Sequence, residues 1–336
     1  MAGNHPKILI IQTAFIGDVI LATSLVESLA KAIPSAETDI LVRKGNESLL
    51  ENNPHINSVM VWDKKSGKYS KLWKLLFEIR RRRYERVINI QRFGSTGFLT
   101  AFSRARYRSG FGKNPFSFAF TLKAGHRIDE KSNDHEIDRN HLLLGDIEKV
   151  EAKPSMPRLY PSESDFNRIK KYQSTPYIVI APASVWFTKQ MPAEKWTELL
   201  NALPAGLKVI FTGSEADKKL ADKIIFDSKN DNCINLCGQI SFLESAALMQ
   251  GAKRCIVNDS APLHIASAVN APVTAVFCST IPAFGFGPLS DDSLIVETND
   301  NLECRPCGLH GKKECPEGHF KCGFNIDINK IVESIG

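Results

Sequence analysis

The stretch KILIIQTAFIGDVILATSLVESLAKAIPSAETDILV, residues 7–42, contains the repeating unit on which the fold is built. Its first six residues form an apolar run without alternation, which is typical of a parallel strand buried on both faces. Residues 17–33 then place apolar side chains at helical spacing and stop before Pro34, and residues 38–42 resume a strand pattern. Strand, helix and strand in this order predict parallel pairing with a right-handed crossover.

The same alternation continues along most of the chain. Further strands are predicted at 58–62, 86–91, 177–181, 208–212, 233–236, 255–258 and 273–277, and helices at 69–83 and from residues 193, 214, 241 and 262. A stretch richer in Pro, Ser and Glu, residues 151–163, interrupts the pattern and is the expected linker. We therefore predict an α/β protein of two Rossmann-like domains, residues 1–155 and 156–336, whose parallel sheets leave a cleft between them.

Composition limits the classes of protein to consider. The 336 residues are 43% hydrophobic and 24% charged, which is ordinary for a globular chain long enough for two cores. No apolar run has the length of a membrane span and residues 1–7 lack the apolar stretch of a signal peptide, so we expect a cytoplasmic protein.

The positive charge is concentrated in the first half. Residues 64–127 contain 17 Lys and Arg against two acidic residues, so one face of the first domain should attract an anion. Nucleic acid is not the expected partner, because no recognition module or RNP-type aromatic series accompanies these residues.

Ligands of open α/β sheets bind beyond the carboxyl ends of the strands, and the first such loop contains Gly17 and Asp18. It lacks the G-x-G-x-x-G sequence of nicotinamide-binding proteins, which argues against a dehydrogenase. Asp18 stands at the start of a helix whose first amides are unpaired, so it is either a stabilising cap or a general base.

Two loops of the second half are candidates for phosphate binding. Residues 181–192 contain Ser184, Thr188 and Lys189, which supply hydroxyl donors and a positive charge, although a single loop lysine is often only solvated. Thr212 and Gly213 end the next strand in the same way, and Gly213 permits a tight turn into a helix.

The segment VNDSAPLH, residues 257–264, is the most informative of the loops. A strand ends at Asn258 and Asp259, Pro262 suits the first turn of a helix, and free amides at residues 260–263 would bind an anion. The alternative is structural, with Asp259 or Ser260 as a helix cap and His264 as a buried, hydrogen-bonded side chain.

Taken together, these loops resemble glycosyltransferase family nine, the ADP-heptose:lipopolysaccharide heptosyltransferases, and the order and spacing agree over about residues 7–330. The resemblance implies the GT-B fold, ADP-heptose as donor, no catalytic metal, and inversion in a single displacement. It implies that Asp18 is the catalytic base, that Lys189 stabilises the departing diphosphate, and that Asp259, Ser260 and His264 bind the nucleotide sugar. The family usually has Gly where this chain has Ala261, and a positive φ there would strain alanine.

The resemblance also supplies a partner for the basic residues. The acceptor in this family is the phosphorylated Kdo-lipid A or heptosyl core in the inner leaflet, so we expect Arg92, Arg106 and Arg108 to bind it. The protein would then lie peripherally on the cytoplasmic face of the inner membrane. Residues 80–83, four arginines at a helix end, are either part of this surface or a solvated face.

The tail segment 304–322 contains four cysteines spaced C-x2-C-x7-C-x6-C, namely Cys304, Cys307, Cys315 and Cys322. The first pair has metal-knuckle spacing, and four thiolates would complete a tetrahedral structural zinc site. The alternative is reduced structural thiols. Some heptosyltransferase II-like members have similar cysteines.

Two other functions fit much of the same pattern. A glycosyltransferase that uses another nucleotide sugar would share almost every residue named. A noncatalytic sugar-nucleotide-binding protein would keep Lys189 and residues 259–264 but would not need Asp18.

Overall fold

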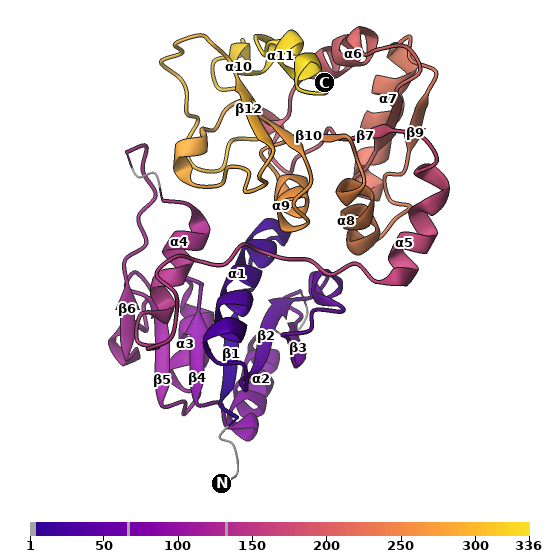
Figure 1. The fold of residues 1–336 in the computed structure, drawn as a ribbon. Helices are drawn as coiled ribbons and strands as arrows, with labels where there is room; N and C mark the ends of the chain where they lie inside the picture. The colour runs from indigo at the N-terminus through magenta and orange to yellow at the C-terminus, as the bar shows by residue number, and fades with distance from the viewer. Residues whose placement is uncertain (1–4, 66–67, 132–133) are drawn as a thin grey trace. The chain divides into compact units, whose positions relative to one another are not determined.

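The computed structural model describes residues 5–65, 68–131 and 134–336. The chain divides into two compact units, the first ending at Tyr160 and the second beginning at Pro161, apart from a few residues near 130 that group with the second. Each unit is built on a six-stranded sheet whose neighbouring strands are all parallel (Figure 1). The predicted α/β class with two parallel sheets is confirmed.

The sheet of the first unit has the strand order β3-β2-β1-β4-β5-β6. Its strands are β1 (Lys7–Ile11), β2 (Glu37–Arg43), β3 (Ser58–Trp62), β4 (Arg86–Asn89), β5 (Tyr107–Phe111) and β6 (Leu122–Ala124). Its helices are α1 (Ile16–Ala32), α2 (Lys68–Arg82), α3 (Gly94–Ala101) and α4 (Glu136–His141), with short 3-10 helices at Glu47–Leu50, Ser117–Ala119 and Leu142–Leu144.

The central strand β1 explains why its sequence does not alternate. Ile8, Leu9, Ile10 and Ile11 are all at most 1% exposed, so both faces of the strand are covered. Leu9 and Ile11 pack with Leu76 of α2 and other side chains of α2 and α3 in one apolar cluster. A strand of this kind buries every side chain, which removes the period-two signal of a half-exposed strand.

The sheet of the second unit has the order β12-β11-β10-β7-β8-β9. Its strands are β7 (Tyr177–Ala181), β8 (Lys208–Phe211), β9 (Cys233–Asn235), β10 (Arg254–Asn258), β11 (Val273–Phe277) and β12 (Ser293–Glu297). Its helices are α5 (Glu163–Ile169), α6 (Ala193–Ala202), α7 (Lys218–Asp227), α8 (Phe242–Gln250), α9 (Ala261–Ala268), α10 (Lys321–Phe324) and α11 (Ile328–Glu333), with short 3-10 helices at Lys170–Tyr172, Phe187–Lys189, Glu215–Asp217 and Pro282–Phe284.

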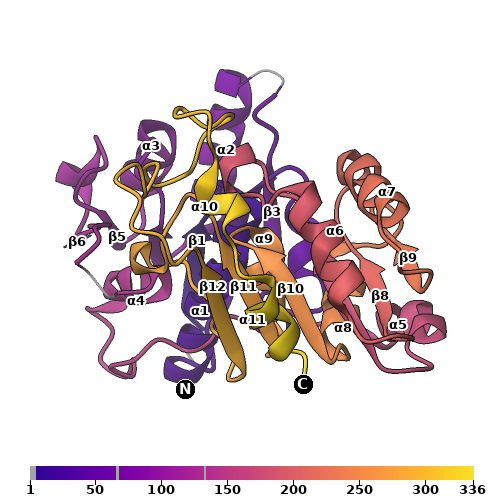
Figure 2. The same ribbon diagram turned by 90° about the horizontal axis from the view of Figure 1, so that it is seen from above.

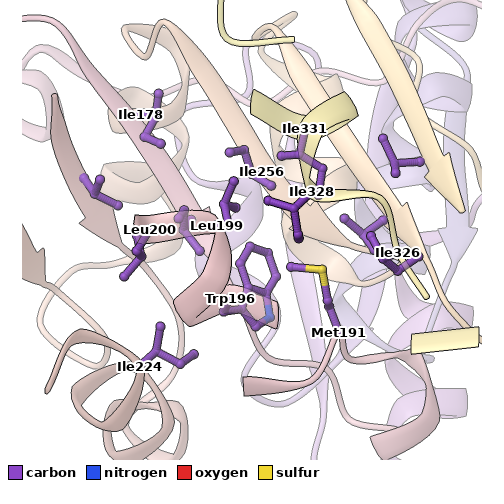
Figure 3. Packing of buried hydrophobic residues seen from close by; sticks show 14 of the residues in the cluster. Ile178, Met191, Trp196, Leu199, Leu200, Ile224, Ile256, Ile326, Ile328 and Ile331 are labelled. Atoms are coloured by element: carbon purple, nitrogen blue, oxygen red, sulfur yellow. The ribbon is translucent and has the colours of Figure 1, made fainter. Parts of the chain in front are cut away.

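The C-terminal helix closes the core of the second unit. Trp196 of α6 is fully buried and belongs to one apolar cluster with Met191 and with Ile328 and Ile331 of α11 (Figure 3). Seen from above, β12, β11 and β10 lie side by side, with α11 beside them (Figure 2). The tail segment 304–322 is therefore anchored at both ends, by β12 before it and by α11 after it.

Three strands, β5, β6 and β12, were not predicted. The sequence of β5, YRSGF, contains an arginine, a serine and a glycine and offers no apolar run, and β6 is a three-residue edge strand. The first three residues of the edge strand β12 are exposed. Edge strands and polar strands carry little of the hydrophobic signal on which such predictions rest. Among the described residues, no helix combines the length and the apolar character that crossing a bilayer requires.

Candidate active site

The first candidate group is Asp18, at the third position of α1 beyond the carboxyl end of β1. Its carboxylate accepts a hydrogen bond of 3.1 Å from the amide of Phe15, the residue that caps the helix. The capping role considered from the sequence is therefore present. It does not use up the carboxylate, because this bond occupies one oxygen and no ion pair to Asp18 exists among the described residues.

The electrostatic surroundings of Asp18 favour a proton acceptor that works near neutral pH. Burial, and after it the nearby carboxylate of Glu136, raise the pKa of Asp18 to about 6, against the lowering effects of the Phe15 amide and of Arg43. The helix start alone would favour a lower pKa, so burial and the like charge outweigh it. At pH 7 about nine-tenths of Asp18 is ionised, and a base is most effective when its pKa lies close to the working pH.

Glu136, at the first position of α4, belongs to a buried polar group. Its two carboxylate oxygens lie 3.1 Å from Nε2 of His126, and Nε of Arg139 donates to one of them over 2.9 Å. Burial works to raise the pKa of Glu136, but the hydrogen bond from His126 and the charges of His126 and Arg139 hold that pKa below its usual value. Glu136 thus stays ionised and keeps a negative charge near Asp18.

The three arginines predicted to bind the acceptor do not lie together. All strands of the first sheet are parallel, so its carboxyl edge carries the residues that follow each strand. Arg92 follows β4 and lies exposed at this edge, which also carries Asp18. It has no hydrogen-bond or ion-pair partner in the described part of the chain. Arg106 and Arg108 stand at the start of β5, on the opposite edge.

The contacts of Arg108 and Arg106 are local. The guanidinium of Arg108 donates to the backbone oxygens of Ala119 and Ala105 over 2.8 and 2.7 Å, and that of Arg106 lies over the Tyr107 ring at 5.1 Å. Arg108 therefore ties β5 to the segment after it. Of the three arginines, only Arg92 shares an edge with Asp18.

The second candidate group lies at the carboxyl edge of the second sheet and joins Lys189 to Asp259. Nζ of Lys189 lies 2.7 Å from Oδ2 of Asp259, and the hydroxyl of Thr280 donates to the same oxygen over 2.6 Å. Asp259 is 4% exposed. This ion pair holds the Lys189 ammonium at one of its three N–H bonds and leaves the other two able to bind a ligand.

The side chain of Thr188 is buried and forms hydrogen bonds within the protein. It is 1% exposed, and its hydroxyl accepts hydrogen bonds from the amide of Lys312, over 2.8 Å, and from the hydroxyl of Ser279, over 2.9 Å. Its amide donates to the oxygen of Lys312 over 3.1 Å. Through Thr188, the tail segment 304–322 holds the loop that carries Lys189.

Gly311 brings the same tail against Lys189 itself. Its φ is +72°, and a Cβ added there would lie 2.9 Å from Cγ of Lys189 and 3.0 Å from the hydroxyl oxygen of Thr188. Both the backbone conformation and the lack of space require glycine. The position of Lys189 therefore depends on a residue 122 positions further along the chain.

The segment after β10 forms the predicted helix start. Ser260 is the cap of α9 in an extended conformation, Ala261 is the first helical residue, and Pro262 follows it. Ala261 is not among the residues with positive φ, so alanine is unstrained where the family usually has glycine. His264 is buried on α9, 5% exposed. The first amides of α9 lie just after Asp259, the partner of Lys189.

The remaining predicted donor-binding residues have structural surroundings. The backbone oxygen of Ser184 accepts a hydrogen bond of 2.9 Å from Gln190. The amide of Thr212 continues the sheet by donating to Ile180 over 2.9 Å, and its buried hydroxyl has no hydrogen-bond partner among the described residues. A Cβ on Gly213 would meet Asp217 and Cys237 at 3.0 to 3.2 Å, so glycine is needed there for space.

The four tail cysteines come together. Cys304, Cys307, Cys315 and Cys322 all line one pocket of about 320 Å³, which His319 also lines. Sγ of Cys304 lies 3.9 Å from Nε2 of His319. All four are unpaired by disulfides, and in the described part of the chain no three His, Cys, Asp or Glu side chains have the arrangement of a metal site.

The residues that the sequence analysis missed are Glu136, His126 and Thr280. Thr280 follows β11, so the rule that directed attention to strand ends applies to it as well. Glu136 lies 118 residues from Asp18 in a segment without a strand signal, and only the folded chain shows that its charge acts on Asp18.

Comparison with known proteins shows the family to which the chain belongs. The model of glycosyltransferase family 9 (heptosyltransferase) matches residues 72–320. Lipopolysaccharide heptosyltransferase 3 of Escherichia coli is 26% identical over 278 residues, covering 79% of this chain and 82% of the relative.

Solved structures are similar over nearly the whole length. The glycosyltransferase family 9 protein of Veillonella parvula has a TM-score of 0.83 at 23% identity, covering 99% of this chain and 97% of that one. The ADP-heptose lipopolysaccharide heptosyltransferase II of E. coli has a TM-score of 0.78 at 21% identity, covering 98% and 97%. These likenesses confirm the predicted GT-B class of fold. With two Rossmann-like units of this kind and a family model that matches most of its length, the chain belongs to glycosyltransferase family 9, the heptosyltransferases.

Proposed function

We propose that this protein is an inverting heptosyltransferase that transfers heptose from ADP-heptose to the inner core of lipopolysaccharide. The observation that carries the proposal is the state of Asp18, a carboxylate at the carboxyl edge of the first sheet whose pKa is raised to about 6. A helix cap alone needs no such environment, whereas a general base does.

The chemistry assigns one task to each sheet edge. Asp18 removes the proton from an acceptor hydroxyl while that oxygen attacks the anomeric carbon of ADP-heptose. The bond from this carbon to the diphosphate breaks in the same step, ADP leaves with the electron pair, and the configuration inverts. Lys189, oriented by Asp259 and Thr280, and the first amides of α9 stabilise the negative charge that builds up on the diphosphate.

Within this proposal the domain comprising residues 1–155 binds the acceptor and that of residues 156–336 binds the donor. Arg92 is the acceptor-binding arginine, because it shares an edge with Asp18. Arg106 and Arg108 lie at the opposite edge, so they bind the acceptor only if the acceptor molecule extends around the sheet. The acceptor is a phosphorylated Kdo-lipid A or heptosyl core, and the lipid part of such a molecule places the reaction at the cytoplasmic face of the inner membrane.

The test is a transfer assay with ADP-heptose and a truncated core acceptor, run in parallel with ADP-glucose and UDP-glucose. Heptose transfer by the wild type, together with its loss in Asp18→Asn, supports the proposal. Transfer of glucose in place of heptose would assign a different nucleotide sugar. Tight binding of ADP-heptose without any transfer would make the protein a noncatalytic sensor.

We further propose that the four tail cysteines bind a structural zinc ion. Their gathering in one pocket supports this, and so does the fact that the tail holds the Lys189 loop through Thr188 and Gly311. Four thiolates are the ligand set of a closed, tetrahedral zinc site. The zinc is not part of the transfer chemistry.

Metal analysis of the purified wild type decides the question of zinc. One equivalent of zinc, lost in Cys304→Ser and retained in Cys255→Ser, supports the site, because Cys255 is buried in β10 outside the pocket. A metal-free wild type that folds and transfers heptose would leave the cysteines as reduced structural thiols.

A further inference from the structure

The first unit carries a cluster of exposed aromatic side chains that the proposed chemistry does not use. Trp73 and Phe77 on α2, Phe102 after α3, Phe118 in a 3-10 helix and Phe93 before α3 are between 44% and 74% exposed. Isolated exposed aromatic side chains are common on protein surfaces, but a cluster of them marks a surface that binds another protein or a membrane.

The rings form a continuous series of contacts that joins α2, the C-terminal part of α3 and residues 116–118. The Trp73 ring centroid lies 5.3 Å from that of Phe98, which lies 4.9 Å from Phe102 and 6.1 Å from Phe116. Phe77 continues this series at one end and Phe118 at the other, at 6.3 and 6.1 Å. We call these six residues the aromatic patch: Trp73, Phe77, Phe98, Phe102, Phe116 and Phe118.

Basic residues are frequent in the part of the sequence that forms the aromatic patch. Between Trp73 and Phe118 the chain has 11 Lys and Arg and two acidic residues, Glu78 and Glu85. Nε of Arg80 donates to the backbone oxygen of Phe102 over 2.7 Å, which holds that cation at the margin of the patch. Arg81 and Arg82 are paired with Glu78, and Arg86 is paired with Asp146, so the charge available at the patch comes from the other basic residues.

The aromatic patch is continuous with the candidate acceptor edge. A Cβ on Gly94 would lie 3.9 Å from the Phe116 ring, and Nδ2 of the Asn114 side chain donates to the backbone oxygen of Phe93 over 3.1 Å. Arg92 immediately precedes Phe93. The aromatic patch is therefore adjacent to Phe93 and Arg92, and Arg92 shares a sheet edge with Asp18.

We propose that the aromatic patch and its basic margin dock the first unit on the surface of an anionic lipid bilayer. Tryptophan and phenylalanine insert at the boundary between headgroups and acyl chains, and lysine and arginine attract anionic headgroups. A second protein copy is less well matched, because a patch with the same positive margin on both partners would repel its own copy. The inference rests on the proposed function, since an acceptor anchored in a bilayer must be reached there.

The test uses the full chain with the double variant Trp73→Ser/Phe77→Ser, and with Phe226→Ser as the matched control. Phe226 is 87% exposed on α7 of the second unit and is not part of the aromatic patch. Binding is measured by sedimentation with vesicles of phosphatidylglycerol and phosphatidylethanolamine and, in parallel, of phosphatidylcholine alone. We expect preferential binding to the anionic vesicles, at least about tenfold weaker in the double variant and unchanged in Phe226→Ser.

Equal vesicle binding by the wild type and the double variant would overturn the inference, as would a wild type that binds neither vesicle. Concentration-dependent dimerisation that the double variant abolishes, without vesicle binding, would assign the patch to a second copy and overturn it too. A transfer assay with a water-soluble, deacylated acceptor separates the two proposals. The double variant should keep its rate there and lose it on a vesicle-bound acceptor. If the wild type transfers no heptose but binds anionic vesicles as expected, the proposed function fails and the docking surface stands.

Discussion

Two aspartates, Asp18 and Asp259, both lie beyond the carboxyl end of a buried parallel strand and near the start of a helix. Their surroundings are opposite. Asp18 is half-buried near another carboxylate, and its pKa is raised to about 6. Asp259 is buried against a lysine and a threonine hydroxyl. One environment makes an aspartate ready to accept a proton, and the other makes an aspartate hold a cation in place. The position in the fold does not determine the role; burial and the neighbouring charges do.

The change with the largest expected effect is Asp18→Asn, which removes the proposed proton acceptor and keeps the shape of the side chain. We expect kcat to fall by about a hundredfold or more. Because the folded pKa of Asp18 lies above its unfolded value, its ionisation costs stability as pH rises from about 4 through 6. At pH 7.5 the variant should therefore be more stable, by about 1–3 kcal/mol. Kinetics and thermal unfolding measure the two effects.

The matched control is Asp165→Asn. Asp165 is also the third residue of a helix, and its carboxylate also accepts a hydrogen bond from the amide of the capping residue, Ser162, over 2.7 Å. This variant should keep its activity and lose only capping energy. If both variants lost activity to the same extent, Asp18 would be a helix cap and the contrast with Asp259 would disappear.

The pair in the second sheet predicts a non-additive result. Lys189→Met and Asp259→Asn should each lower kcat/KM for ADP-heptose by about 10- to 100-fold. The first variant removes the positive charge, and the second removes the carboxylate that holds the Lys189 ammonium in position. Because Asp259 acts through Lys189, the double variant should be no worse than Lys189→Met alone. A double-mutant cycle measures this coupling. Additive losses would mean that Asp259 contacts the donor directly.

The two aspartates should also differ in the pH profile. Asp18 must be ionised to accept a proton, so kcat/KM should rise with pH through about 6 and be about tenfold below its plateau at pH 5. Glu136→Gln removes the like charge and should move this acidic limb to lower pH by less than one unit, since burial is the larger cause of the shift. If the residual activity of Asp18→Asn still rose with pH through about 6, the acidic limb of the profile would belong to a group other than Asp18.

The smallest expected effect concerns the tail that holds the Lys189 loop. Gly311→Ala should cost about 1–2 kcal/mol of stability and raise KM for the donor by a few-fold, because the new Cβ meets Lys189. Gly308→Ala is the control. Gly308 has a similar φ of +78° but no atom within 4 Å of the added Cβ, so that variant should show the backbone strain without the change in KM. Equal KM values would show that the tail does not position Lys189.

Much of this protein was predictable from local sequence. Strands β3, β7 and β11 have the predicted limits, and β1, β2, β4, β8, β9 and β10 differ from them by one or two residues, because continuous apolar runs and helix stops are local signals. The same rule of strand ends located Asp18, Lys189 and Asp259. Their joint spacing was enough to indicate the family.

What the sequence by itself determined is therefore the two α/β units, the strand ends that carry the candidate site residues, and the family. Tertiary structure alone decided which charges meet there. It brought Glu136 near Asp18, Asp259 and Thr280 onto Lys189, Gly311 against the same lysine, and six aromatic rings from three segments into one surface. It also separated Arg92 from Arg106 and Arg108, which are close in sequence. The reason is physical: hydrophobic periodicity is a property of neighbouring residues, whereas a pKa or an ion pair depends on distances across the folded chain.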